Sequence, residues 1–319
     1  MSRVGVVDLG TNSTRLLVAD VNGGAVSEVE RRLVITHLGE GVDERRLLLP
    51  TALARVRNVL ADFRRALEEQ GAGRTLAVAT SAVRDAENGE AFLGEVEWSY
   101  GFETQLLTGH EEALLTFRGV SAGRELRDDT LVVDVGGGST ELVLGGPDGV
   151  AWHDSLDLGC VRLTERFLRS DPPSSEELDA CAAHVGALLA ERVPAGTRPV
   201  RAIGVAGTVT TLAALSLGLA EEDPELVDGH VLEAGWIRGQ VERLAALPVA
   251  QIRDLRGMHP DRAPVILAGA VVVAGTLRHF GLDALEASER DLMHGAALAA
   301  AELPERPEGN APPGAYTCC

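Results

Sequence analysis

The sequence predicts an α/β protein made of two similarly organised domains, each containing a mixed β-sheet. The 319 residues correspond to about two domains at ~150 residues each. Apolar residues alternate between the spacing of strands and that of helices, which is typical of an α/β class. A strand–turn–strand segment near the N-terminus also recurs near the middle of the chain. With 45% hydrophobic and 24% charged residues, the chain is expected to fold.

The recurring segment is the strongest evidence for two domains. Residues 6–18 (VVDLGTNSTRLLV) and residues 132–144 (VVDVGGGSTELVL) are identical at seven of thirteen positions. Each copy is an apolar strand that ends in aspartate, followed by a turn of small residues and a second apolar strand, as in a β-hairpin. Because a hairpin opens each half of the chain, both sheets should contain antiparallel as well as parallel strands.

The segments after each hairpin alternate between helix and strand patterns. In the first half we expect a helix over 53–67, a strand over 75–79, a helix over 86–96 and a strand over 102–107. In the second half we expect a helix over 175–193, a strand over 200–205, a glycine turn at 206–207 and an apolar helix after Pro264.

A polar stretch at 121–129, with one glycine and five charged residues, directly precedes the second hairpin. Such composition is typical of a domain boundary. We therefore expect an N-terminal phosphate-loop domain over 1–125 and a C-terminal one over 126–302. The Pro- and Gly-bearing residues 303–319 should form a flexible tail.

Composition excludes several classes of protein. The net charge of -19 argues against a general nucleic-acid-binding or membrane-surface protein. All 29 basic residues are arginine, which excludes Schiff-base chemistry, a Walker phosphate loop and a protein-kinase lysine. No apolar run reaches the ~20 residues of a membrane span. The four cysteines show neither metal-ligand spacing nor a disulfide ladder, so we expect a cytoplasmic protein.

The turns of the two hairpins are candidate phosphate-binding loops. Glycine lets backbone N–H groups converge on an anion, and serine and threonine hydroxyls add further donors. A tight turn alone would explain one such loop, but the duplication favours a phosphate chain held by both. The candidate residues are Gly10, Thr11, Asn12 and Ser13 in the first loop and Gly136, Gly137, Gly138 and Ser139 in the second.

A third glycine turn, 204–208, lies between a predicted strand and a helix. Gly207 could bind an anion at the helix N-terminus. Close packing of the helix on the strand explains the same glycine equally well.

Aspartates end the first strand of both hairpins, and a carboxylate beside a phosphate site favours an intervening cation. We therefore expect Asp8 and Asp134 to bind Mg²⁺. The alternative is an Asx-turn that begins each loop. The copies differ in charge at one matched position, Arg15 against Glu141. This asymmetry suggests that one loop favours phosphate and the other favours metal or water.

Residues 108–113 (TGHEEA) predict the start of a helix and a catalytic base. Thr108 and Glu111 have the spacing of a capping box, which gives Glu111 a structural role. Glu112 is then the candidate to accept a proton from an attacking water. The alternative is an ordinary partner for the helix dipole. Arg84, after the strand at 75–79, is either a phosphate-binding fork or a surface residue.

Five motifs together resemble the exopolyphosphatase and guanosine pentaphosphate phosphohydrolase (Ppx/GppA) family. They occur in family order and are VDLGTNS at 7–13, ATSAVR at 79–84, TGHEEA at 108–113, DVGGGSTE at 134–141 and GVAGT at 204–208. The resemblance implies a two-domain actin-like ATPase (ribonuclease H-like) fold with an interdomain cleft. It also implies a homodimer, and release of terminal orthophosphate with a divalent metal, Mg²⁺ or Mn²⁺.

Carried over residue by residue, the resemblance makes Glu112 the catalytic glutamate, Asp134 and Glu141 the acids for metal and water, and Arg84 a phosphate-binding arginine. The chain resembles the short form without a C-terminal helical extension. It departs from the family at 291–295 (DLMHG), where many members have Leu-Arg-Glu-Gly. The missing arginine there could weaken a phosphate or nucleotide contact.

The predicted function is therefore an exopolyphosphatase that acts on polyphosphate and, as a second substrate, guanosine pentaphosphate. Glu112 would activate the water, with Glu141 assisting. One alternative is a non-catalytic sensor of guanosine tetra- or pentaphosphate, suggested by Met293 and His294. A further alternative is an actin-like ATPase or sugar kinase.

Overall fold

The computed structural model describes residues 1–124, 126–220 and 223–304. They form two compact units. The first comprises Met1–Arg124 together with the segment that begins at Leu292, and the second spans Glu125–Asp291. Residues 305–319, which make up most of the predicted tail, lie outside the described residues.

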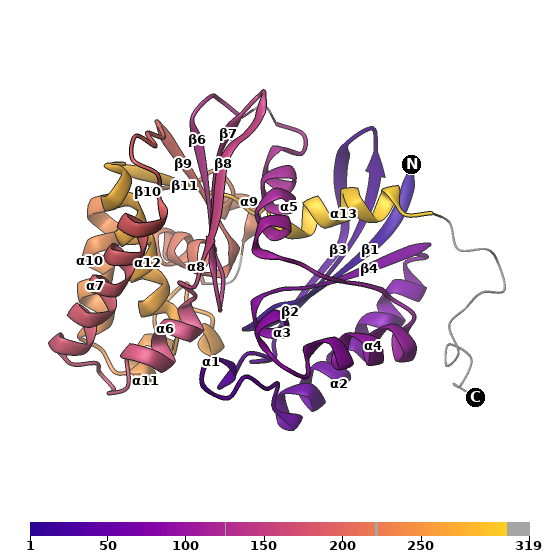
Figure 1. Cartoon of the computed structure of the whole chain (residues 1–319), viewed down its shortest axis with the longest axis horizontal. Helices are drawn as coiled ribbons and strands as arrows, with labels where there is room; N and C mark the ends of the chain where they lie inside the picture. Colours follow the sequence, from indigo (N-terminus) through magenta and orange to yellow (C-terminus); the bar gives the residue numbers. More distant parts are fainter. Residues whose placement is uncertain (125, 221–222, 305–319) are drawn as a thin grey trace. The chain divides into compact units, whose positions relative to one another are not determined.

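The first unit is a five-stranded mixed sheet with helices on both faces (Figure 1). Its elements are β1 (Ser2–Leu9), β2 (Ser13–Asn22), β3 (Ala25–Ile35), α1 (Val42–Arg45), α2 (Pro50–Glu69), β4 (Arg74–Ala79), α3 (Ser81–Asp85), α4 (Gly89–Tyr100), β5 (Glu103–Leu106), α5 (Gly109–Ser121) and α13 (Leu292–Glu302). The strand order is β3-β2-β1-β4-β5. Strands β1 to β3 are antiparallel neighbours, whereas β4 is parallel to β1 and β5 is parallel to β4.

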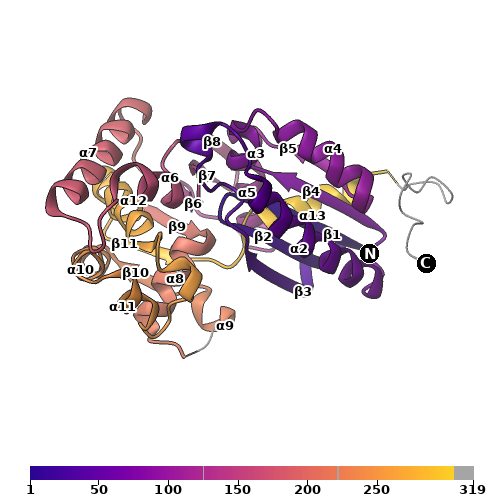
Figure 2. The same ribbon diagram turned by 90° about the horizontal axis from the view of Figure 1, so that it is seen from below.

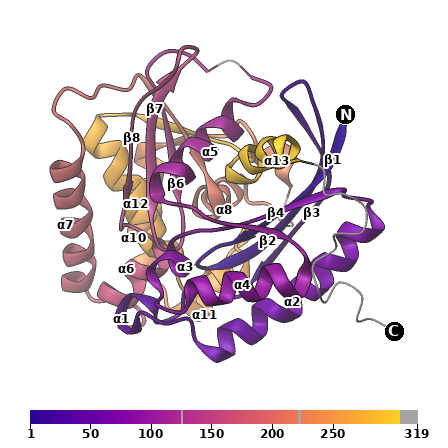
Figure 3. The ribbon, with the colours of Figure 1, turned by 45° about the vertical axis from the view of Figure 1, so that its right-hand side comes forward.

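Alternating side chains of β1 and β2 divide the first core into two layers. Val7, Leu9 and Leu16 are buried with the apolar faces of α2 and α4. Val4 and Val6, at intervening positions, are buried on the opposite face with residues of α13. Figure 3 shows α2 and α4 on one side of this sheet and α5 and α13 on the other. Successive side chains of a strand point to opposite faces of the sheet, so the apolar residues at alternate positions form both buried faces of the first sheet.

The position of α13 corrects the predicted domain boundaries. We expected residues 126–302 to form one domain, but the chain returns to the first unit after Asp291. Helix α13 carries a run of alanines, and Ala296, Ala297 and Ala300 are fully buried against the first sheet. Helix α13 is not among the elements predicted from the sequence, and its apolar residues do not show which sheet it covers, because either sheet could bury such a face.

The second unit contains a six-stranded mixed sheet. Its elements are β6 (Thr130–Val135), β7 (Thr140–Gly146), β8 (Gly149–Leu156), α6 (Cys160–Phe167), α7 (Ser175–Arg192), β9 (Arg201–Val205), α8 (Ala206–Leu217), α9 (Pro224–Val227), β10 (Val231–Glu233), α10 (Ala234–Ala245), α11 (Val249–Arg253), the 3₁₀ turn η1 (Pro260–Arg262), α12 (Ile266–Phe280) and β11 (Ala284–Ala287). The strand order is β10-β11-β9-β6-β7-β8. Helices α7, α10 and α12 pack together in this unit (Figure 2).

The two sheets share one topology, which confirms that the sequence repeat is a structural repeat. Read from β8, the second sheet runs β8-β7-β6-β9-β11, which matches β3-β2-β1-β4-β5 strand for strand. In both, three antiparallel strands are followed by two parallel ones. This duplicated mixed sheet is the actin-like, ribonuclease H-like architecture that the resemblance implied.

The predicted helices and strands of both halves are present, with two differences. The glycine turn expected at 206–207 is instead the start of helix α8, which follows β9 directly. The helix expected over 86–96 begins only at Gly89, and a separate short helix, α3, precedes it. At the break, the Asn88 side-chain oxygen accepts from the Leu48 N–H at 2.8 Å and its NH2 group donates to the Leu48 carbonyl at 3.0 Å. These partners are distant in sequence, so the local pattern could not reveal the break. No helix among the described residues is long and apolar enough to cross a membrane.

We expect Glu177 to make the stability of the second unit depend on pH. Hydrogen bonds from the Ser170 hydroxyl and the Ser174 backbone N–H lower the pKa of this carboxyl from 4.5 to about 2. Because the folded-state pKa is depressed, its contribution is full above the unfolded pKa and is lost as pH falls through the folded pKa. Glu177→Gln should therefore lower the melting temperature at about pH 7 but hardly at pH ~2. Calorimetry at both pH values tests this, and an equal deficit at both would contradict it.

Candidate active site

The two hairpin turns have the same backbone geometry. In the first loop, the Gly10 N–H donates to the Ser13 carbonyl at 3.0 Å, and in the second the Gly136 N–H donates to the Ser139 carbonyl at 3.0 Å. A Cβ atom at Gly10 would lie 2.9 Å from the Ser13 carbonyl oxygen. The tight turn therefore requires glycine at its first position. The predicted loop residues are thus brought together within each unit.

The first loop is braced by the segment that follows β3. The Asn12 carbonyl accepts hydrogen bonds from the N–H groups of Thr36 and His37, at 3.0 and 2.9 Å, and the Thr11 carbonyl accepts one from Gly39 at 2.7 Å. The His37 ring nitrogen Nδ1 also lies 3.2 Å from Asn12 Oδ1. Sequence reasoning missed this segment. The available signal was Gly39, where a Cβ would lie 2.3 Å from the Thr11 side chain.

The second loop is braced in the same way by the start of α6. The Gly136 carbonyl accepts from the Cys160 N–H at 3.0 Å, and the Gly137 carbonyl accepts from the Val161 N–H at 2.8 Å. The Arg162 guanidinium donates from Nε to the Gly138 carbonyl at 2.8 Å. Burial raises the pKa of the Cys160 thiol to about 11, so this cysteine is a packing residue.

In both loops, carbonyl groups therefore accept hydrogen bonds from other parts of the same unit. By contrast, the described residues supply no hydrogen-bond acceptor for the backbone N–H groups of Thr11, Asn12, Gly137 and Gly138. Backbone polar groups in such partly buried places are normally satisfied, by the chain or by a ligand. Adjacent N–H donors with no protein acceptor are suited to an anion.

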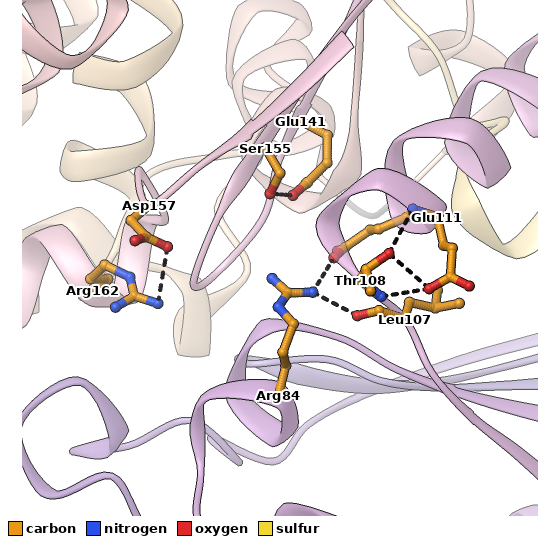
Figure 4. A network of polar contacts seen from close by, with 9 residues as sticks. Arg84, Leu107, Thr108, Glu111, Glu141, Ser155, Asp157 and Arg162 are labelled. Carbon is orange, nitrogen blue, oxygen red and sulfur yellow. Dashed lines mark hydrogen bonds and ion pairs between the residues drawn. The ribbon is translucent and has the colours of Figure 1, made fainter. Parts of the chain in front are cut away.

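The two hairpins differ in the residue that lies opposite the aspartate on the neighbouring strand. Asp8 lies directly opposite Arg15 in the β1–β2 register, and Asp134 lies directly opposite Glu141 in the β6–β7 register. Arg15 Nε is 2.8 Å from Asp8 Oδ2, so the first aspartate has a guanidinium partner within its own unit. The second hairpin instead holds two carboxyl groups at matched positions. Glu141 is 1% exposed, and its Oε1 accepts from the Ser155 hydroxyl at 2.7 Å (Figure 4).

The pair of carboxyl groups in the second hairpin is better suited to bind a divalent cation than the Asp8–Arg15 pair in the first. Directly opposed residues on an antiparallel pair project from the same face, and like charges there are destabilising. A cation relieves this repulsion, and carboxylate oxygens are ligands that Mg²⁺ prefers. No cluster of three His, Cys, Asp or Glu suited to a metal occurs in the described ranges. A bound ion would therefore need oxygens from water or substrate, which Mg²⁺ commonly uses.

The predicted catalytic helix begins as expected. Thr108 and Glu111 form the complete capping box, in which the Thr108 N–H and hydroxyl both donate to Glu111 Oε2 at 2.8 Å (Figure 4). These bonds lower the pKa of Glu111. The structural role expected for Glu111 is therefore confirmed.

Glu112, the next residue, is buried in α5 and lies beside Arg84. The Arg84 nitrogen Nη1 is 3.2 Å from Glu112 Oε2 and also donates to the Leu107 carbonyl at 2.8 Å. The structure thus joins the predicted base and the predicted phosphate-binding arginine in one ion pair. Arg84 therefore has defined partners, in contrast to the alternative of an exposed surface arginine. Its contacts hold the Glu112 carboxylate at the start of α5.

The segment predicted as a third glycine turn is the end of β9 and the start of helix α8, and an arginine contacts it. Arg262 Nη1 donates to the Gly207 carbonyl at 3.1 Å and to the Thr211 hydroxyl at 2.9 Å. A Cβ at Gly207 would lie 2.9 Å from the guanidinium carbon of Arg262. Arg262 was not a predicted site residue. Gly207 therefore has a packing role here, and its phosphate-binding role remains a prediction.

The departure at 291–295 lies away from the first phosphate loop. His294 is buried, and its Nε2 is 2.9 Å from Glu28 Oε1 on β3. Glu28 pairs with Ala19, six residues along β2 from Ser13, which corresponds to about 20 Å of strand. Within the first unit, the His294 side chain therefore contacts β3 and not the first loop. The sensor that this departure suggested stays an alternative prediction.

We expect Gly159→Ala to damage the second loop. A Cβ at this position would lie 2.1 Å from the Gly137 carbonyl oxygen and 2.3 Å from the Gly138 carbonyl carbon. Backbone atoms cannot move aside as a flexible side chain can, so the loop must shift. Because a displacement of ~1 Å can lower activity about 100-fold, a loss of roughly that size is expected in a phosphate-release assay.

The matched control for that variant is Gly239→Ala in α10, where a Cβ would meet nothing within 4 Å. It should keep full activity and gain up to about 1 kcal/mol of stability. Full activity in Gly159→Ala would show that the loop geometry is not required.

The fold and the paired loops define a class of protein, the two-domain actin-like proteins with one loop hairpin in each unit. Residues 17–302 match the Ppx/GppA phosphatase family, and the chain belongs to this family. This confirms the resemblance found in the sequence and the hydrolase class of the enzyme.

Several relatives agree with this assignment. The chain is 38% identical to exopolyphosphatase 2 of Mycobacterium tuberculosis, over 94% of this chain and 99% of the relative. It is 33% identical to exopolyphosphatase 1 of the same organism, over 89% and 84%. A solved exopolyphosphatase-like protein superposes with a TM-score of 0.87 at 37% identity, over 93% of this chain and 98% of the other. A Ppx/GppA family member from Aquifex aeolicus gives 0.78 at 32% identity, over 94% and 98%.

Proposed function

We propose that the protein is an exopolyphosphatase, which releases terminal orthophosphate from inorganic polyphosphate by attack of water. The observation that carries this proposal is the repeated loop, in which carbonyl groups bond to the protein while adjacent N–H groups have no acceptor among the described residues. A loop of this kind suits a phosphate group, and each unit carries one. The exopolyphosphatase names of two relatives support the same substrate.

Each site residue has a proposed role. The backbone N–H groups of both loops bind phosphate oxygens, and Arg84 adds a positive charge. Glu112 accepts a proton from the attacking water, and Glu141 helps to orient that water through its hydrogen-bonded carboxylate. Phosphoryl transfer depends on positioning and charge neutralisation more than on covalent catalysis, so these groups together with a divalent metal ion would suffice.

Asp134, with Glu141 opposite it, would hold the Mg²⁺ or Mn²⁺ ion. When bound, the ion supplies neutralisation of charge on the phosphate oxygens. Asp8 is a weaker candidate because Arg15 already neutralises it. The proposal for the metal therefore rests on the second hairpin.

A panel of phosphate donors tests the function. The protein with Mg²⁺ is incubated with long and short polyphosphate, guanosine pentaphosphate and ATP, and orthophosphate is measured. Release from polyphosphate supports the proposal, and release from guanosine pentaphosphate identifies a second substrate. Hydrolysis or transfer confined to ATP would indicate an ATPase or kinase. Binding of guanosine tetra- or pentaphosphate without any release would indicate a sensor.

Two further expectations belong to this proposal. Cys160 and Cys181 are free thiols, which are most stable in the reducing cytoplasm. The family resemblance also implies a homodimer. Light scattering of the purified protein tests the dimer.

A further inference from the structure

Helix α13 approaches the helix that carries Glu112 more closely than any side chain would allow. Gly295 of α13 faces the backbone of α5, where a Cβ would lie 1.9 Å from the Leu115 carbonyl oxygen and 2.7 Å from its carbonyl carbon. Leu115 is one helical turn after Glu112. The contact is therefore made by backbone atoms, which cannot yield by changing rotamer.

Helix α13 has no room to retreat from this contact. Ala296 and Ala297 are fully buried against the first sheet, in one cluster with Val4, Val6 and Leu17. Small side chains let α13 lie close to the strands beneath it. A side chain at position 295 would consequently move α5, from 1.9 Å to at least the 3.0 Å that real Cβ contacts show.

A shift of α5 would be felt at the Glu112 carboxylate. That carboxylate is held by Arg84 at 3.2 Å, and the helix start is fixed by the Thr108–Glu111 capping box. Displacement one turn away would tilt α5 about this fixed start. A movement of about 1 Å in a catalytic group can lower turnover by up to ~100-fold.

We propose that Gly295 is a positioning residue, which sets the position of α5 and thereby aims Glu112 at the attacking water. This inference rests on the proposed role of Glu112. It assigns a purpose to the glycine of the 291–295 motif that the phosphate loops do not explain.

A double-mutant cycle tests the inference. Gly295→Ala should lower kcat for polyphosphate by about 10- to 100-fold while KM changes less than about threefold. In the Glu112→Gln background, Gly295→Ala should have almost no further effect, because the group that it positions has already been removed. A merely structural glycine would instead lower activity by the same factor in both backgrounds, and that result would overturn the inference.

Controls separate stability from positioning. Val56→Ala removes buried methyl groups between α2 and the opposite face of the first sheet, so it should lower the melting temperature without changing kcat at low temperature. If Gly295→Ala does not fold, the cycle is repeated with Gly295→Ala/Ala296→Gly, which gives α13 room to move toward the strands. That pair should recover folding and part of kcat.

The outcomes also separate this inference from the proposed function. Full activity in Glu112→Gln would reject the proposed base. Loss of activity in Glu112→Gln together with full activity in folded Gly295→Ala would reject only the positioning role.

Discussion

Replacing Glu112 with glutamine is expected to lower kcat for polyphosphate by ~10²- to 10⁴-fold, the range for loss of a general base. Glutamine keeps the shape of the side chain but cannot accept the proton. KM should change little, because the proposal assigns phosphate binding to the loops and Arg84. The measurement is steady-state release of orthophosphate at saturating substrate.

Glu111→Gln is the matched control, because it makes the same chemical change one residue earlier on the same helix. Glu111 completes the capping box, and glutamine is also accepted at that position. This variant should keep turnover within about twofold, since it removes a charge that only supports the helix start. A Glu112→Gln enzyme within a few-fold of wild type would reject the assignment of the base.

Asp134→Asn is expected to have the second large effect. If Asp134 holds the proposed cation, loss of its carboxylate weakens a site whose neutralisation of charge contributes several kcal/mol, so orthophosphate release should fall by roughly 100-fold or more. The Mg²⁺ concentration for half-maximal activity should also rise. A titration of activity with Mg²⁺ measures both.

The stability of that variant should change in the opposite direction. Asp134 lies opposite Glu141 in a buried register pair, and removing one of two like charges relieves repulsion. In the absence of Mg²⁺, Asp134→Asn should melt at the wild-type temperature or above it. Asp154→Asn is the control on the neighbouring strand β8, where the carboxylate binds Arg192, and it should leave the Mg²⁺ dependence unchanged. Identical Mg²⁺ titrations for wild type and Asp134→Asn would contradict the metal assignment.

Several parts of the site followed from short-range sequence patterns. The repeat placed Asp8 and Asp134 at the ends of equivalent strands, and the structure confirms the two hairpins and their common turn bond. The capping-box spacing identified Glu111 as the residue that completes the cap, which the structure confirms. These features were predictable because residues close in sequence determine turns, caps and hairpin register.

Other parts depended on residues far apart in the chain. The segments that brace the loops, at 36–39 and 160–162, bond to carbonyl groups more than twenty residues away. The ion pair between Arg84 and Glu112 and the contact of Gly295 with Leu115 likewise join separate elements. No periodicity encodes such partners, because it reports only which face of an element is apolar.

The sequence by itself determined the duplicated α/β plan, the two hairpins with their glycine turns and the start of the helix that carries Glu112. These follow from local backbone preferences and from strand and helix periods. Only the tertiary structure decided that α13 belongs to the first unit, that Arg15 neutralises Asp8 while Glu141 faces Asp134, and that the loop carbonyls are used internally. Packing and charge pairing between distant elements select among arrangements that local preferences leave equally favourable.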